Sequence, residues 1–220
     1  YEWPLSNHGI EVDHMDNVWI GGNGSSDSHV LKFARDGTFL MQIGRARARF
    51  VGTNNDGRPI FERNSNDKES FGRVAKISFV ADANEIYLAD GYLNKRIVVI
   101  DSNTGDFKRY WGAYGNPPDD EQAAAMERYS PDQPPAPQFR GPVHCAEPSN
   151  DGLLYVCDRA ADRIQVFQLD GTYVQEVFIA PRTLSQGSTW DIAFSPDPEQ
   201  KFIYLADGQN MKVYVIHRES

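Results

Sequence analysis

Glu85-Ile-Tyr-Leu-Ala-Asp90 is the stretch that decides the fold, because three other segments of the chain follow its pattern. Each segment is a short apolar run built around one aromatic residue, with a second apolar run before it and a third after it. The shared aromatic residues are Trp19, Tyr87, Tyr155 and Tyr204. The recurring unit therefore contains at least three short strands.

A fourth run completes three of the units, after a turn at Asp36-Gly37, Thr104-Gly105 or Asp170-Gly171. Gly accepts the positive φ that such hairpin turns require. The runs are rich in Val, Ile, Phe and Tyr and are bounded by Gly, Asn and Asp, which is typical of strands. Four antiparallel strands repeated in tandem predict an all-β protein, a β-propeller. No helical periodicity persists for three turns, and a β-sandwich would not repeat the strand-and-turn order.

The last unit stops after its third strand and leaves an uncovered sheet edge. We therefore expect residues 1–220 to be one propeller domain of about four blades, incomplete at both ends and arranged as an open arc of a larger ring. Two inserts, residues 45–73 and 113–140, separate successive blades. The first contains Arg45, Arg47 and Arg49, which favour a solvated loop, and the second is rich in proline with a short helix expected within residues 119–129.

Composition narrows the functional classes. The chain has 220 residues, 40% of them hydrophobic, and a formal net charge of −9. No apolar run approaches the roughly 20 residues that cross a bilayer, which predicts a soluble protein without a membrane span. The acidic balance argues against a nucleic-acid partner and leaves small-molecule, peptide or protein partners open. Cys145 and Cys157 could form one bridge or remain two buried thiols, and we expect the thiols.

Two histidines, His8 and His144, begin the first strands of units one and three. First strands line a propeller's channel, and in a six-bladed ring alternate blades lie 120° apart. A third histidine from a fifth blade would complete a three-nitrogen site, which suits catalytic zinc. From the residues alone, we prefer two channel histidines that are hydrogen-bonded to backbone or water.

Further segments carry a resemblance to a known family. The chain resembles NHL-repeat propellers and, among them, the lyase domain of peptidylglycine α-amidating enzymes. Asn7-His8-Gly9-Ile10 and Pro142-Val-His144 resemble that family's ligand segments. Ala89-Asp-Gly-Tyr92-Leu-Asn-Lys-Arg96-Ile97 resembles the segment with its catalytic tyrosine, although Leu93 stands where the family has cysteine. Asp158-Arg159 resembles a segment whose arginine faces the active site.

The resemblance implies a six-bladed ring, a central zinc ion, a structural calcium ion and an extracellular or periplasmic, secreted protein. It also implies cleavage of peptidyl-α-hydroxyglycine to a peptide amide and glyoxylate. His8 and His144 would be metal ligands, Tyr92 the base and Arg159 the group that orients an anion. The alternative is a non-catalytic NHL interaction module that docks a protein or peptide on its insert-bearing face.

Three aspartates recur at the ends of second strands, one in each of the last three units: Asp90, Asp158 and Asp207. Their regular recurrence favours a structural role, accepting backbone N–H bonds in tight turns, over three catalytic carboxylates.

Overall fold

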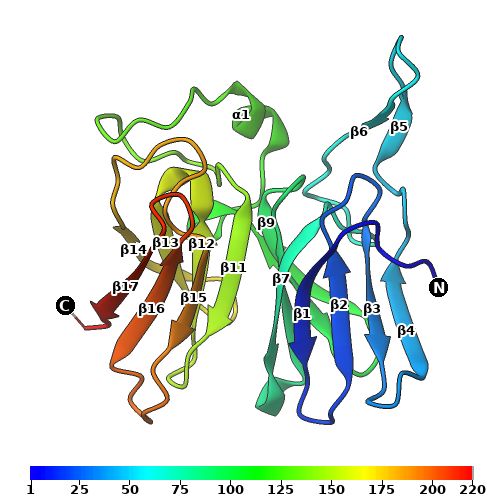
Figure 1. The fold of residues 1–220 in the computed structure, drawn as a ribbon, viewed down its shortest axis with the longest axis horizontal. Helices are drawn as coiled ribbons and strands as arrows, with labels where there is room; N and C mark the ends of the chain where they lie inside the picture. Colours follow the sequence, from blue (N-terminus) through cyan, green and yellow to red (C-terminus); the bar gives the residue numbers. More distant parts are fainter. Residues whose placement is uncertain (220) are drawn as a thin grey trace.

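The computed structural model describes residues 1–219 and shows four antiparallel sheets set side by side (Figure 1). Blade one contains β1 (Asn7–Val12), β2 (Val18–Gly22), β3 (His29–Phe33) and β4 (Phe39–Gly44). Blade two contains β7 (Val74–Val80), β8 (Glu85–Asp90), β9 (Arg96–Asp101) and β10 (Phe107–Trp111). Blade three contains β11 (Val143–Pro148), β12 (Leu153–Asp158), β13 (Arg163–Gln168) and β14 (Tyr173–Phe178). Blade four contains β15 (Asp191–Phe194), β16 (Phe202–Asp207) and β17 (Lys212–His217). The predicted all-β propeller is confirmed.

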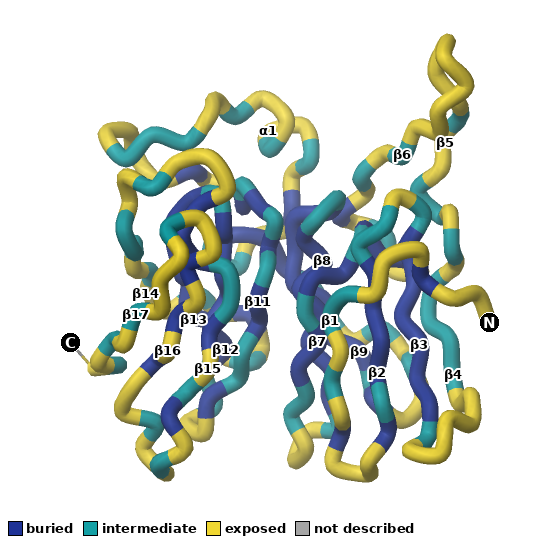
Figure 2. Tube along the Cα trace, viewed as in Figure 1, coloured by how far each residue is buried: buried dark blue, intermediate teal, exposed yellow. Residues whose placement is uncertain are grey.

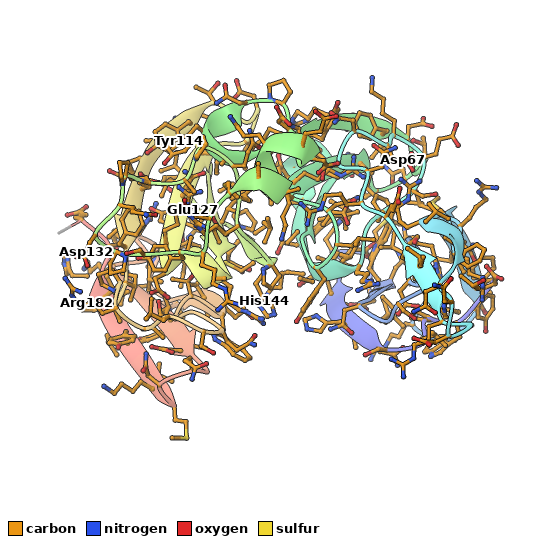
Figure 3. All side chains as sticks on the ribbon, turned by 90° about the horizontal axis from the view of Figure 1, so that it is seen from above. Asp67, Tyr114, Glu127, Asp132, His144 and Arg182 are labelled. Carbon is orange, nitrogen blue, oxygen red and sulfur yellow. A yellow bond between two sulfur atoms is a disulfide. The ribbon has the colours of Figure 1, made fainter. Side chains whose placement is uncertain are left out.

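First strands are the innermost, because β7 packs against β1 on one side and β11 on the other, and β11 packs against β15. Seen from above, the blades follow an arc (Figure 3). Within residues 1–219, no strand from the N-terminal segment pairs with β17. A larger ring stays a prediction.

The four repeated aromatic residues occupy equivalent blade positions, as the sequence predicts. Each lies on a second strand, opposite the same position of a first strand: Trp19 opposite Glu11, Tyr87 opposite Ser78, Tyr155 opposite Glu147 and Tyr204 opposite Ala193. Apolar residues between successive blades form the core, which Figure 2 shows as buried strand centres.

Both inserts lie on one face of the propeller (Figure 1). Residues 113–140 include α1 (Asp120–Ala125), whose first turn is capped by Asp119, with the carboxylate accepting the Gln122 N–H at 2.8 Å. Residues 45–73 include a projecting hairpin, β5 (Phe50–Thr53) and β6 (Pro59–Phe61), which the sequence analysis did not predict. No helix within residues 1–219 has the length and apolar character needed to span a membrane.

The expectation of two buried thiols is wrong, because Cys145 and Cys157 form a disulfide. They lie directly opposite one another on β11 and β12, with Cα atoms 4.8 Å apart. Such a cross-strand pair is within bridging distance. The register between β11 and β12 therefore determines whether the two cysteines can form a disulfide. The number of cysteines in the sequence does not reveal this register.

Two buried ion pairs fix the inserts to the blades. Asp158 pairs with Arg163 and Asp90 pairs with Arg96, and all four side chains are fully buried. Each arginine also donates to insert carbonyl oxygens: Arg163 to Ala136 and Gln138, Arg96 to Ser65, Asp67 and Ser70.

The aspartates of these pairs also hold the segment that enters the first strand. Asp158 accepts the N–H groups of Arg140 and Gly141 at 3.1 and 2.7 Å, and Asp90 accepts that of Gly72 at 2.6 Å. Asp207, in contrast, accepts the N–H of Asn210 within its own turn. All three carboxylates thus bond to backbone N–H groups.

Replacing Arg163 by Met should lower the free energy of unfolding by about 3–5 kcal/mol, because it leaves the Asp158 charge buried without a partner. The matched control is Arg182→Met, which breaks an exposed pair with Asp132 and should cost less than about 1 kcal/mol. Urea unfolding followed by tryptophan fluorescence measures both. Similar losses in the two variants would contradict the assigned role.

Candidate functional site

His8 and His144 each lie at a β-bulge near the start of an innermost strand. The register of β1 with β2 shifts just after His8, and that of β11 with β12 shifts around His144. A bulge interrupts the alternation of side chains and re-aims one of them. Gly9 supports the first bulge with a φ of +67°, and a Cβ there would lie 3.0 Å from the carbonyl oxygen of Ala75. Glycine therefore allows β1 to approach β7 closely.

Each imidazole is oriented by a backbone carbonyl of the next blade. His8 Nδ1 lies 2.6 Å from the oxygen of Ala75, and His144 Nδ1 lies 2.5 Å from that of Trp190. A carbonyl oxygen only accepts, so both Nδ1 atoms carry a proton. The neutral form of each ring therefore has its lone pair on Nε2, as in metal-ligating histidines whose other nitrogen donates to a carbonyl.

Tyr92 lies between the two rings. Its hydroxyl oxygen is 2.9 Å from His144 Nε2 and 3.2 Å from His8 Nε2, and the imidazole centroids are 5.4 Å apart. The structure thus brings together His8, His144 and Tyr92 from three different blades. Figure 3 labels His144 on this innermost region.

The contact between Tyr92 and the two histidines has fewer hydrogen-bond donors than acceptors. The Tyr92 hydroxyl has one proton and can donate it to only one of the two Nε2 atoms. The other neutral Nε2 then faces the hydroxyl oxygen without a proton between them, so two acceptors are in contact. A cation or an additional proton would resolve this arrangement. Two imidazoles that share one tetrahedral metal ion would have ring centroids roughly 5 Å apart, so the observed spacing fits a common ion.

Arg159 borders the same site from the 3-10 turn Arg159–Ala161 between β12 and β13. Its guanidinium carbon lies 4.5 Å from the ring of Trp190 and 5.8 Å from that of Tyr92, and Nη2 donates to Gln186 at 2.7 Å. Its Nε is buried and has no hydrogen-bond partner among residues 1–219. Burial lowers the pKa of Arg159, and the side chain keeps donor capacity for an anion.

Trp190 and Gln186 were not predicted from the sequence. Trp190 precedes β15 at the position that His8 and His144 occupy in their own blades, and this shared position was the available signal. Gln186 lies in the loop between β14 and β15, and no sequence pattern identifies it as a site residue. Together they hold Arg159, and the Trp190 carbonyl also orients His144.

Electrostatics keep His144 neutral. Burial, with smaller contributions from the nearby charges of Arg159 and His8, lowers the pKa of His144 to about 4. The ring is therefore available as a lone-pair donor at neutral pH.

A second layer of charged groups lines the channel below the histidines. Glu11, Lys76, Glu147 and Asp191 come from the four innermost strands. Lys76 Nζ lies 3.0 Å from Asp191 and 3.7 Å from Glu147. Burial raises the pKa of Glu147 to about 7, against the opposing charge of Lys76. Sequence patterns gave no indication of this layer.

Within residues 1–219, no group of three or more His, Cys, Asp or Glu side chains is placed to hold a metal ion. Of the three histidines that the expected site needs, His8 and His144 are present, and their rings converge. Zinc and calcium binding stay predictions.

Comparison with known proteins gives distant relatives. The chain is 26% identical over 171 residues to peptidyl-glycine alpha-amidating monooxygenase A of Xenopus laevis and 28% identical over 172 residues to its monooxygenase B. Each match covers 77% of this chain, and the chain spans only 15% and 16% of those relatives. The predicted resemblance to amidating enzymes is confirmed as a distant similarity. No protein-family model matches the chain.

Solved structures share the fold. Virginiamycin B lyase from Staphylococcus aureus aligns with 98% of this chain and 53% of its own, with a TM-score of 0.54 and 15% identity. U3-55K aligns with 99% of this chain and 53% of its own, with a TM-score of 0.51 and 10% identity. These likenesses show the propeller architecture alone.

The His144 ring should titrate with a midpoint near pH 4, because the buried site disfavours the imidazolium. NMR of the imidazole protons, assigned by comparison with His144→Gln, measures the midpoint. A His144 midpoint above about 6 would contradict the assigned burial effect.

Glu147 should make the protein less stable as pH rises. Its pKa is higher in the folded chain than in the unfolded chain, so the folded state binds more protons between about pH 4.5 and pH 7 and loses this advantage at higher pH. Relative to Glu147→Gln, the wild-type protein should lose about 2–3 kcal/mol of unfolding free energy between pH 4 and pH 8. Urea unfolding at several pH values measures this loss, and the exposed Glu199→Gln should track the wild type. Parallel curves for the wild type and Glu147→Gln would refute the prediction.

Proposed function

We propose that the channel mouth is a metal-assisted lyase site that cleaves peptidyl-α-hydroxyglycine to a peptide amide and glyoxylate. The observation that carries the proposal is the convergence of two Nε2 lone pairs and the Tyr92 oxygen within 2.9–3.2 Å. A set of acceptors with too few protons favours a bound cation. The distant relatives are named for peptidyl-glycine alpha-amidation.

His8 and His144 would hold the metal, with zinc as the candidate, and a further ligand would come from outside the residues described. When bound, such a metal supplies Lewis-acid polarisation of a substrate oxygen. The carbonyl groups of Ala75 and Trp190 keep both rings in the tautomer that presents Nε2. No donor set here is assigned to calcium.

Arg159 and Tyr92 would act on the substrate directly. The guanidinium of Arg159, stacked on Trp190, would pair with the substrate carboxylate and orient it. Once its own proton has been released in the presence of a bound cation, the Tyr92 oxygen would accept the proton of the substrate hydroxyl as general base. The hydroxyl oxygen then forms the carbonyl of glyoxylate while the C–N bond breaks, and the same proton passes from Tyr92 to the departing amide nitrogen. Atoms and charges balance without a further reactant.

The alternative is a non-catalytic NHL interaction module that binds a protein or peptide through its insert-bearing face. Such a module needs no convergence of two imidazoles, a phenol and a guanidinium at the channel mouth. The geometry therefore favours the lyase proposal.

Tyr92→Phe should lower kcat for glyoxylate release by at least about 100-fold, because it removes the proton acceptor, and should leave zinc binding within about threefold. His144→Ala should lose both zinc binding and turnover, whereas His14→Ala should keep both. Calorimetry with zinc alone and an assay of glyoxylate release from a peptidyl-α-hydroxyglycine measure these effects. Absence of zinc binding and of turnover in the wild-type protein would overturn the proposal.

A further inference from the structure

We propose that the insert-bearing face docks a second copy of this chain, with the projecting hairpin of each copy bound to an acidic part of the other copy's second insert. The hairpin segment is residues 45–63, and the acidic segment is residues 119–132. This inference is independent of the proposed function. It assigns a role to the arginines of the first insert, which the channel-mouth site does not use.

The two segments carry opposite charges. The hairpin segment contains five arginines and two carboxylates, whereas the acidic segment contains five carboxylates and one arginine. Arg45 and Arg58 are exposed and form no ion pair within residues 1–219, and the same is true of Glu121 and Glu127. Complementary charges of this kind orient two surfaces toward each other and exclude partners of the wrong sign.

The hairpin segment is poorly covered by its own chain. β5 and β6 pair with each other and with no strand of a blade, and they project beyond the face (Figure 1). Phe50, Val51 and Ile60 are 38%, 54% and 41% exposed. A two-stranded hairpin has little stability of its own in water, and exposed apolar groups rimmed by charges are typical of interaction surfaces.

The hairpin is nevertheless shaped before any partner binds. The Asn54 side chain accepts the N–H groups of Asp56 and Arg58 at 3.0 and 2.8 Å, which closes the turn. At the base, Arg49 forms an ion pair with Asp67. A preformed element binds without the cost of ordering a loop.

The acidic segment borders an apolar hollow of about 300 Å³ over blade three. Its polar lining includes Arg140 and Arg163, so the hollow suits the apolar side chains of the hairpin rather than its arginines. Proline rings pack well against aromatic side chains such as that of Phe50. Prolines and one phenylalanine supply much of the apolar lining: Pro131, Pro134, Pro135, Phe178 and Pro181.

A single symmetry operation makes both contacts at once. The hairpin segment projects on the side of blade one, and the acidic segment extends from α1 over blade three (Figures 1 and 3). A two-fold axis across the face, above blade two, turns two faces toward each other and exchanges the positions of blades one and three. Each hairpin then meets the acidic segment of the other copy, and the dimer is closed. The two channel mouths face each other in this dimer.

The predicted dimer is weak and sensitive to salt. Exposed charge pairs contribute little individually, and they are screened within roughly 8 Å at physiological ionic strength. We expect a dissociation constant of roughly 1–100 µM, as for transient interfaces, and at least about tenfold weaker association in 0.5 M salt than in 0.05 M salt. Sedimentation velocity of the full chain over this concentration range measures both values.

Charge reversal gives two variants that should repair each other. The hairpin variant is Arg45→Glu with Arg58→Glu, and the insert variant is Glu121→Lys with Glu127→Lys. Each variant alone brings like charges together and should associate at least about tenfold more weakly than the wild type. An equimolar mixture should form dimers again, because every hairpin then faces a segment of opposite charge.

Arg35→Glu with Lys201→Glu is the matched control. It also reverses two exposed cations, but in turns at the opposite end of the blades, and it should dimerise like the wild type. Urea unfolding checks that every variant is folded.

Three results would overturn the inference: a monomeric wild type, dimers retained by both reversal variants, or a mixture of the variants that stays monomeric. A monomeric wild type that binds phosphatidylserine vesicles, with binding lost in the hairpin variant, would overturn it as well and assign the hairpin to a membrane surface.

Discussion

The buried pairing of Asp158 with Arg163, repeated by Asp90 with Arg96, is the interaction on which the functional face depends. Two charges without solvent are tolerable only when their remaining donors and acceptors are satisfied. Here the insert and the strand-entering segment satisfy them, since insert carbonyls accept from the arginine and N–H groups donate to the aspartate. One ion pair thereby fixes the insert, the second strand, the third strand and the start of β11, where His144 lies.

The residues that line the channel repeat in every second blade. Blades one and three supply His8 and His144 at the mouth and Glu11 and Glu147 below. Blades two and four supply the carbonyl groups that orient the histidines, from Ala75 and Trp190. They also supply Lys76 and Asp191 to the lower layer. Alternation of blades thus separates the groups that would hold a ligand from those that position them.

Much of the fold and part of the site follow from the sequence. Strand alternation and Asp-Gly turns are local signals, and they predict the four blades and their aromatic positions. Blade topology then places His8 and His144 at the channel, and the resemblance adds Tyr92 and Arg159 to the same site, where the structure brings all four together. The lower charged layer and Gln186 could not be predicted, because contacts between blades depend on radial packing and on loop conformation. The β5–β6 hairpin was missed because its strands are short and exposed, despite the turn at Asp56-Gly57.

The Cys145–Cys157 crosslink ties the candidate site to the redox state of its surroundings. β11 carries His144 next to Cys145, and β12 leads through Cys157 and Asp158 to Arg159. The bond therefore joins covalently the two strands that present a metal-ligand candidate and an anion-binding candidate. Disulfides form and persist in oxidising compartments. Oxidative maturation of this single bond would thus be a step in assembling the site, and a reducing cytosol would deliver the chain with its two functional strands joined only by hydrogen bonds.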